Sequence, residues 1–194
     1  MSGLGFVLDL GRCVGCGSCV LACRLENQWP EGVSWRRILP LNLDRFAGGP
    51  TYTFSVACHH CDRPACLTAC PSGAYEKRAD GVVLLKRELC LGCRYCEMAC
   101  PFGAPSFDAA AGVMTKCHLC SHRIDTGLHP ACVSACPTGA LTIQTSVGQK
   151  SLSERDRIPG FSATGGCEPN IRFRAPGGQI RRRRLLEFRR ETKS

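Results

Sequence analysis

"CLGCRYCEMACPFGA", residues 90–104, places four cysteines within eleven positions and follows the last with a proline. Disulfides, structural zinc and iron–sulfur clusters each need a different cysteine spacing. Disulfide frameworks suit short secreted chains. This chain has 194 residues and opens without the basic and apolar regions of a signal peptide, so we expect free thiols rather than disulfides.

The spacing within this run separates the two remaining chemistries. Cys90, Cys93 and Cys96 have two residues between them, and Cys100 follows after three more. Structural zinc usually takes two distant C-x2-C pairs instead. The C-x2-C-x2-C-x3-C-P run is typical of bacterial ferredoxins, whose thiolates ligate [4Fe–4S] clusters. The run therefore predicts an iron–sulfur protein.

The run recurs along the chain, so that four motifs of four account for sixteen of the 17 cysteines. Proline follows the last cysteine in three motifs, whereas motif one has Arg24 there. Cys167 lies outside every motif, and we expect it to be dispensable as a ligand. We therefore predict four [4Fe–4S] clusters. In chain order, the motifs are Cys13, Cys16, Cys19, Cys23; Cys58, Cys61, Cys66, Cys70; Cys90, Cys93, Cys96, Cys100; and Cys117, Cys120, Cys132, Cys136.

Short strand-like runs and turns lie between the motifs. The runs "GFVLDL" and "TYTFSVA" precede motifs one and two, and Asp80-Gly81 and Gly112 mark the turns of two hairpins. Motifs one and four flank the closely spaced motifs two and three. We therefore predict an α+β fold of two nested bacterial-ferredoxin-like units, with short hairpins and helices and much irregular structure. The predicted parts are an outer half (1–57 plus 108–150, with an insertion at 24–57), an inner half (58–107) and a basic C-terminal docking segment (151–194).

The ligand sets follow from a rule of two-cluster ferredoxins, in which the fourth cysteine of each run ligates the other cluster. Carried over to this chain, the rule exchanges the fourth cysteines within the outer pair and within the inner pair of motifs. The predicted sets are Cys13, Cys16, Cys19 with Cys136; Cys117, Cys120, Cys132 with Cys23; Cys58, Cys61, Cys66 with Cys100; and Cys90, Cys93, Cys96 with Cys70.

Composition agrees with a fold organised by metal clusters. Only 7% of the residues are aromatic, and there are 21 glycines and 12 prolines, so a large apolar core is not expected. The net charge of +9 is concentrated in residues 171–194, which hold nine Arg or Lys against two Glu. We interpret this tail as a solvated or partner-facing segment, in which Leu185, Leu186 and Phe188 could form a short docking helix. No apolar run reaches ~18 residues, so membrane contact is expected only through a partner.

The remaining candidate residues are assigned lesser roles. Trp29 and Trp35 in the insertion are expected to shield a cluster from water, with partner recognition as the alternative. The five histidines are interpreted as structural or hydrogen-bonding, because the cysteines already supply every ligand: His59, His60, His118, His122 and His129. We find no nucleophile–base pair, phosphate loop or dinucleotide fingerprint, so no catalytic residue is predicted.

The motifs "CLGCRYCEMACPFGAP", "CPSGA" and "MTKC" resemble those of the four-cluster iron–sulfur (B) subunits of dimethyl sulfoxide reductase and polysulfide reductase type molybdopterin oxidoreductases. The resemblance covers residues 5 to about 144. It implies an electron-transfer subunit without its own substrate site. Such a subunit transfers electrons between a molybdenum or tungsten pterin catalytic subunit and a quinone-reactive membrane subunit in anaerobic respiration. Cys93 stands where relatives with a three-iron cluster carry tryptophan, which implies four [4Fe–4S] clusters. The sequence "CEPNIRF" fits a terminal segment lying over the surface.

Two other functional classes remain open from the sequence. One is a soluble polyferredoxin serving hydrogenase or formate dehydrogenase, and the other is a zinc-bearing nucleic-acid-binding module that uses the arginine-rich tail. The resemblance favours a membrane-associated complex and no nucleic-acid partner. Which face of the membrane the complex occupies stays open, as do the substrate and the direction of electron flow.

Overall fold

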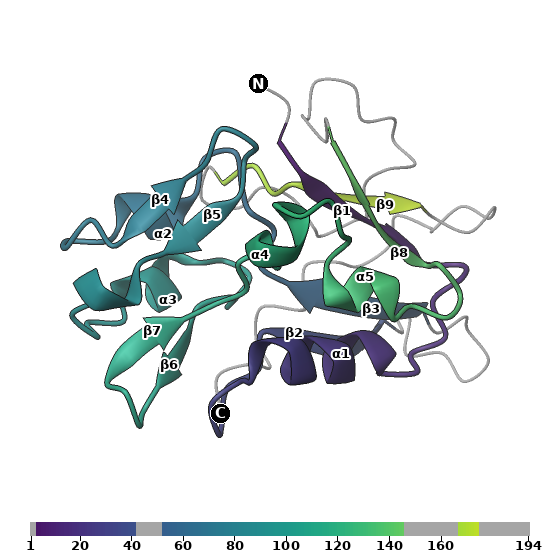
Figure 1. Cartoon of the computed structure of the whole chain (residues 1–194), viewed down its shortest axis with the longest axis horizontal. Coiled ribbons are helices and arrows are strands. Elements are labelled where there is room, and N and C mark those ends of the chain that lie inside the picture. Colours follow the sequence, from purple (N-terminus) through teal and green to yellow (C-terminus); the bar gives the residue numbers. More distant parts are fainter. Residues whose placement is uncertain (1–2, 42–51, 146–166, 175–194) are drawn as a thin grey trace.

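A three-stranded sheet joins the two ends of the chain in the computed structural model, which describes residues 3–41, 52–145 and 167–174 (Figure 1). Strand β1 (Gly5–Asp9) lies between β8 (Leu141–Gln144), which is antiparallel to it, and β9 (Ile171–Arg174), which is parallel. The strand predicted before motif one is thereby confirmed. Phe6, Val7 and Leu8 are all buried, and their strand is the central one of the three.

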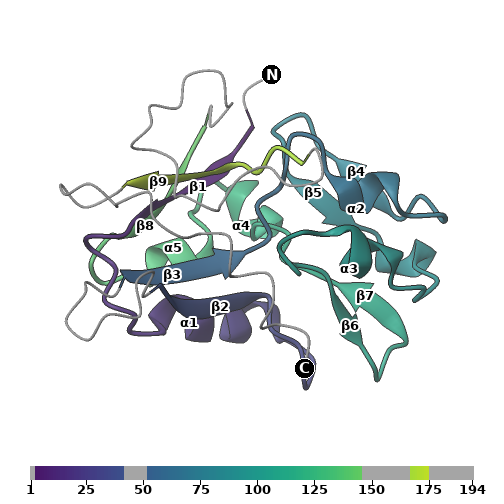
Figure 2. The same ribbon diagram turned by 180° about the vertical axis from the view of Figure 1, so that it is seen from behind.

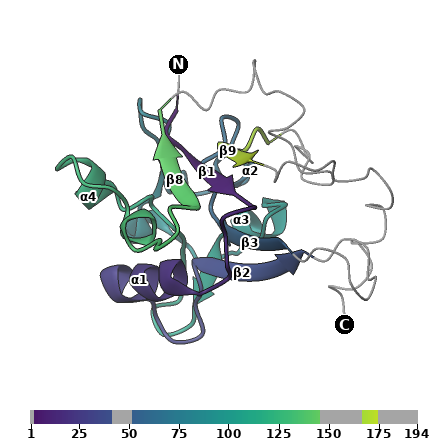
Figure 3. The ribbon, with the colours of Figure 1, turned by 90° about the vertical axis from the view of Figure 1, so that its right-hand side faces the viewer.

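A β-hairpin packs against one face of the sheet. It consists of β2 (Arg36–Leu41) and β3 (Tyr52–Ala57), and β3 is the strand predicted before motif two. The rings of Phe54 and Phe173 lie 5.0 Å apart between their centres and join the hairpin to β9. Figure 3 shows the sheet stacked on this hairpin, with helix α1 (Ser18–Asn27) alongside.

The remaining elements are short, and all except α4 and α5 form a group beside this sheet and hairpin (Figures 1 and 2). They are α2 (Ala65–Thr68), β4 (Tyr75–Lys77), β5 (Val83–Leu85), η1 (Arg87–Leu89), α3 (Tyr95–Ala99), β6 (Ser106–Asp108), β7 (Val113–Thr115), α4 (Ser121–Ile124) and α5 (Ala131–Ser134). The β4–β5 and β6–β7 pairs are antiparallel, which confirms the hairpins predicted at Asp80-Gly81 and at Gly112. Helices α4 and α5 belong to motif four, and α4 lies between the two groups of elements.

Proline decides how far each cysteine-bearing helix extends. Helix α3 ends at Ala99, and Cys100 is already extended (φ −83°, ψ 113°), as expected for a residue that precedes proline. Motif one has Arg24 in place of that proline, and α1 therefore continues past Cys23 to Asn27. This extra turn brings Asn27 beside the cysteines of motif four, as described below.

Two sequence expectations require correction. The boundary expected after residue 107 falls inside the β6–β7 hairpin, where Asp108 pairs with Val113. A boundary there would break the hydrogen-bonded pairing of the two strands, so the hairpin belongs to one unit. The expectation that "CEPNIRF" lies over the surface is wrong, since Ile171 and Phe173 are buried on β9. Their alternation places both apolar side chains on one face of the strand, which fills an edge of the sheet.

Residues 167–174 also tie the ends of the chain to motif two. The backbone N–H of Asn170 donates to the carbonyl oxygen of His59 at 3.0 Å, and its side-chain amide donates to that of His60 at 2.7 Å. The N–H of Asp62 donates to the carbonyl oxygen of Glu168 at 2.6 Å. The segment 167–170 therefore closes over the cysteine loop of motif two. The rest of the segment 151–194, including the predicted docking helix, lies outside the described residues.

Candidate metal centres

All seventeen cysteines have free thiols in the structure. Cys16 and Cys93 are exposed, and the others are buried or partly buried. Most of these thiols gather in groups that are brought together from distant parts of the sequence. The groups are identified from the hydrogen bonds of the sulfur atoms and from the effect of each thiolate on the pKa of the neighbouring thiols.

The first group joins motif one to the end of motif four. Burial raises the pKa of the Cys13 thiol, and the thiolates of Cys19, Cys136 and Cys16 raise it further because like charges lie close together. Cys136 is therefore a neighbour of Cys13, although 122 residues separate them in the sequence. The exchange rule predicts this neighbourhood.

The second group joins the end of motif one to motif four. Burial raises the pKa of the Cys23 thiol to about 12, and the thiolates of Cys132 and Cys120 add to the effect. The side-chain amide nitrogen of Asn27 lies 3.6 Å from Cys23 Sγ and 3.8 Å from Cys120 Sγ, and donates to both. Helix α1 thus supplies both a thiol and a hydrogen-bond donor to this group.

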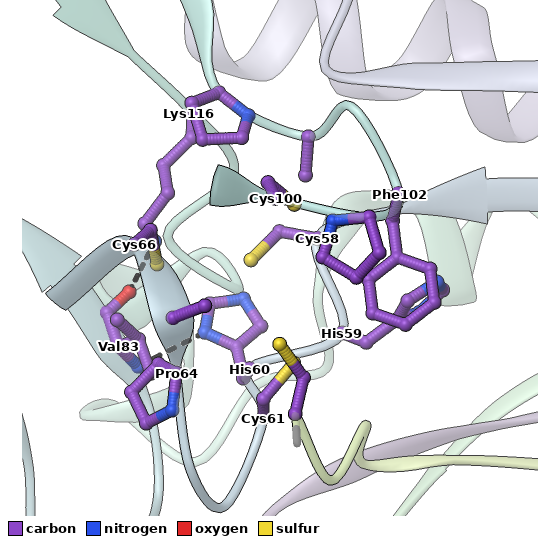
Figure 4. A pocket seen from close by; sticks show the side chains of 15 residues that line it. Cys58, His59, His60, Cys61, Pro64, Cys66, Val83, Cys100, Phe102 and Lys116 are labelled. Carbon is purple, nitrogen blue, oxygen red and sulfur yellow. Dashed lines mark hydrogen bonds between the residues drawn. The ribbon is translucent and has the colours of Figure 1, made fainter. Parts of the chain in front are cut away.

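The third group surrounds a cavity beneath α2 and β5. Burial raises the pKa of Cys61, and the thiolates of Cys58, Cys167, Cys100 and Cys66 raise it further. All five of these sulfur-bearing residues line the cavity. Figure 4 shows the four motif cysteines around it, together with His60 and Lys116. Cys167, the spare thiol of the sequence, therefore lies beside a group of four.

The fourth group lies between α3 and the β6–β7 hairpin. Burial raises the pKa of Cys96, and the thiolates of Cys90 and Cys70 raise it further. The backbone N–H groups of Gly92 and Met114 donate to Cys90 Sγ at 3.5 and 3.3 Å. Gly92 has a φ of 66°, and a Cβ there would lie 2.3 Å from the carbonyl oxygen of Gly112, so this close approach of the two loops requires glycine.

Backbone donors reach sulfur in the outer groups as well. The N–H of Leu119 donates to Cys117 Sγ at 3.4 Å, and the N–H of Leu141 donates to Cys136 Sγ at 3.4 Å. Hydrogen bonds of this kind are among the means by which proteins set the reduction potential of iron–sulfur clusters.

Buried polar atoms without a partner provide a test of whether these groups fit a cluster. His60 Nδ1 accepts a hydrogen bond from the N–H of Val83 at 3.0 Å, so the neutral ring carries its proton on Nε2. That nitrogen is buried and has no hydrogen-bond partner in the part of the chain that the structure describes. Burial lowers the pKa of His60 well below its usual range, which keeps the ring neutral. Because buried donors are rarely left unpaired, an acceptor in the thiol-lined cavity fits this site.

The thiol groups also differ from a site for a single ion. Among residues 3–41, 52–145 and 167–174, no three His, Cys, Asp or Glu side chains converge as ligands of one ion would. A cubane does not require such convergence, because each of the four thiolates binds a different iron atom of the cluster. Four thiols spread around a cavity, with N–H groups aimed at sulfur, therefore fit [4Fe–4S] ligation.

Comparison with known proteins agrees with this chemistry. Residues 50–146 match the family described as "4Fe-4S dicluster domain", and residues 6–25 match "4Fe-4S binding domain". The probable anaerobic dimethyl sulfoxide reductase protein YnfG of Escherichia coli K12 is 46% identical over 151 residues, 71% of each chain. The B chain of the anaerobic dimethyl sulfoxide reductase of the same strain is 43% identical over 150 residues, again 71% of each chain.

The chain belongs to the iron–sulfur subunits of the dimethyl sulfoxide reductase family. This confirms the resemblance seen in its motifs. The B subunit of the tetrathionate reductase of Salmonella typhimurium, 33% identical over 173 residues that cover 85% of this chain and 69% of the relative, is similar as well. The chain is accordingly an iron–sulfur electron-transfer subunit of a respiratory oxidoreductase.

Sequence reasoning identified the motif cysteines of this iron–sulfur subunit but not their surroundings. Trp29 is buried and Trp35 is partly buried, and their ring centres lie 6.3 Å apart. Their role as a shield for a cluster stays a prediction. His122 pairs with Glu26 at 2.8 Å, while His60 faces the cavity. The contact of Asn27 with Cys120 was missed because the two residues are far apart in the sequence. His60 was expected to form hydrogen bonds, but its place at the thiol-lined cavity was not predicted.

Replacing Cys167 by serine in the iron–sulfur subunit is expected to leave the iron content unchanged. Cys167 lines the third cavity, yet the four motif cysteines already surround that space, and serine preserves its size. Iron and acid-labile sulfide assays on the purified variant and the parent chain test this. A fall of about four iron atoms per chain, one cubane, would mean that Cys167 is a ligand in place of a motif cysteine.

Proposed function

We propose that the chain binds four [4Fe–4S] clusters through its sixteen motif cysteines and conducts electrons between two partner subunits. The four thiol groups carry this proposal. The ligand sets are Cys13, Cys16, Cys19, Cys136; Cys117, Cys120, Cys132, Cys23; Cys58, Cys61, Cys66, Cys100; and Cys90, Cys93, Cys96, Cys70. The sets support two nested ferredoxin-like units, with the inner unit extended to residue 116 so that it includes the β6–β7 hairpin.

Contacts between the thiol groups support a linear order. Burial raises the pKa of the Cys132 thiol, and the Cys19 thiolate of the first group raises that pKa further. Burial raises the pKa of Cys117, and the thiolate of Cys58 in the third group adds to the effect. In the same way, Cys66 of the third group neighbours Cys96 of the fourth. These effects support the order first, second, third, fourth for the proposed ligand sets.

A [4Fe–4S] cluster supplies reversible uptake of one electron when it is bound. The protein holds the four sites at fixed separation on its loops and aims N–H groups at the sulfurs. Cys16 in the first set and Cys93 in the fourth are exposed, whereas the cysteines of the second and third sets are buried or partly buried. The two ends of the proposed path therefore open to the surface, and its middle is shielded from water.

Apolar side chains at both ends support docking of partner subunits there. Leu91 and Met98, close in sequence to cysteines of the fourth set, are 72% and 73% exposed. Val14 and Leu21, close in sequence to cysteines of the first set, are 67% and 59% exposed. We propose a molybdopterin catalytic subunit at one end and an integral membrane quinone-reactive subunit at the other. No helix in the described ranges is long and apolar enough to cross a membrane. Membrane association is accordingly assigned to the partner, and substrate turnover to the catalytic subunit.

The proposal predicts about sixteen iron atoms per chain, four for each cubane. Anaerobic iron and acid-labile sulfide assays on freshly purified chain measure this number. About eight iron atoms would contradict the four-cluster assignment, as would a three-iron EPR signal in protein never exposed to oxygen. Purification of the native complex in high salt separates a permanent subunit, which stays bound, from a shuttling polyferredoxin, which dissociates.

A further inference from the structure

Arg36 is one of the most deeply buried side chains of the chain, with 1% of its surface exposed. It is the first residue of β2 and pairs with Ala57, the residue before Cys58. Its neighbour Arg37 is exposed, because successive side chains of a strand point to opposite faces. One arginine of this pair therefore carries its charge into the interior.

The contacts of Arg36 lead to sulfur rather than to a carboxylate. Its Nη1 donates to the hydroxyl oxygen of Ser55 at 2.8 Å, and that oxygen lies 3.4 Å from Cys19 Sγ. The guanidinium carbon lies 4.6 Å from the centre of the Phe6 ring. Nε and Nη2 are buried and have no hydrogen-bond partner among the residues that the structure describes.

No carboxylate of the residues that the structure describes balances the charge of Arg36. None of the ion pairs within the described ranges includes this residue. Arginine does not lose its proton in proteins, and a buried charge without a countercharge is strongly unfavourable. An anion must therefore face the guanidinium in the functional protein.

The cysteines of the first and second ligand sets provide that anion. Burial lowers the pKa of Arg36, but the thiolates of Cys132, Cys117, Cys19 and Cys23 more than offset it and raise the pKa overall. Cys19 belongs to the first set and the other three to the second. The guanidinium thus lies between two neighbouring positions of the proposed path.

We propose that Arg36 is an electrostatic positioning residue that balances the negative charge of the first and second clusters and raises the reduction potential of both. The inference rests on the cluster assignment above. Reduction adds one electron to a cluster that is already surrounded by thiolates, and no bond is made or broken. A fixed positive charge nearby favours the reduced form because that form is the more negative one, and burial keeps water from screening the interaction.

Redox titration of the iron-loaded full-length chain, followed by low-temperature EPR, tests the proposal. Arg36→Gln keeps an amide donor for Ser55 and removes the charge, Arg36→Lys keeps the charge, and Arg37→Gln removes the adjacent exposed charge. In Arg36→Gln, the reduction equilibria of the two centres affected by Cys16→Ser and Cys120→Ser should shift at least tenfold toward oxidation, about 59 mV. Arg36→Lys should retain most of the parent potentials, and Arg37→Gln should shift them less than threefold.

The outcomes are distinguishable from those of the proposed function. A parent chain without four centres would contradict the cluster assignment itself. Unchanged potentials in a fully loaded Arg36→Gln chain would overturn the role of Arg36. Equal loss of iron from the glutamine and lysine variants would also overturn it, since shape rather than charge would then be required. Loss of iron from Arg36→Gln alone would support a requirement for the charge.

Discussion

Removal of iron from the subunit is expected to abolish its cooperative folding and not only its colour. The core between α3 and the two hairpins contains the buried side chains of Cys66, Tyr75, Val83, Cys96 and Met114. Two of these five are proposed ligands. Burial of each of the other three side chains contributes about 1.5–3 kcal/mol to the free energy of folding. Ordering the backbone costs ~1–2 kcal/mol per residue, so this part of the chain depends on the clusters to fix its loops.

The measurement is thermal unfolding monitored by near-UV circular dichroism, under anaerobic conditions and with a reductant that prevents disulfides. Chain treated with an iron chelator is compared with chain incubated without it. We expect the cooperative transition of the loaded chain to be lost. A transition within about 4 °C of that of the loaded chain would contradict the expectation, because such a shift corresponds to only ~1 kcal/mol in a protein of this size.

Serine at Cys136 is expected to damage the same spectroscopic centre as serine at Cys16, and not the centre of its sequence neighbours. Proximity in sequence would assign Cys136 to Cys120 and Cys132. In the structure, however, Cys136 lies near Cys13. Its Sγ also accepts a hydrogen bond from the N–H of Leu141 on β8, the strand that pairs with β1 ahead of motif one. Antiparallel pairing of β1 and β8 therefore brings the last cysteine of motif four to the first cluster.

The reciprocal exchange provides the second half of this test. Cys23→Ser should damage the centre affected by Cys120→Ser, because Asn27 holds Cys23 and Cys120 within reach of one amide. Each variant should lose or convert one centre of four, while the other three keep their EPR signals. Cys167→Ser is the matched control, a buried cysteine outside every proposed set. If Cys136→Ser instead altered the Cys120 centre, the nested arrangement would be wrong.

Local patterns were sufficient to predict the strands and hairpins around the motifs. Strand β1 follows from an apolar run before the first cysteine, and both hairpins follow from turn residues between strand-like runs. The cofactor class could be predicted as well, because cysteine spacing reflects the geometry of one cofactor, and the family followed from the resemblance of the motifs. These features depend on residues that are neighbours in the sequence.

Features that depend on distant partners could not be predicted in this way. The strand β9 was missed because its partner β1 lies about 165 residues earlier in the chain. Nothing in the sequence near Ile171 indicates that β1 has an edge available for pairing. Arg36 was missed because it stands next to Arg37 on the same strand. Alternation shows that one of the two side chains faces inward, but the sequence of two identical residues does not indicate which one.

The place of residues 167–170 in the chain has a consequence for biosynthesis. Every motif cysteine leaves the ribosome before Cys167, and the hydrogen bonds of Asn170 to His59 and His60 form only after that segment has been made. Residues 167–170 can therefore close over the cysteine loop of motif two only after all sixteen motif cysteines have been synthesised. A stop codon after Gln144 would yield a polypeptide with all sixteen motif cysteines but without the segment that closes over the cysteine loop of motif two.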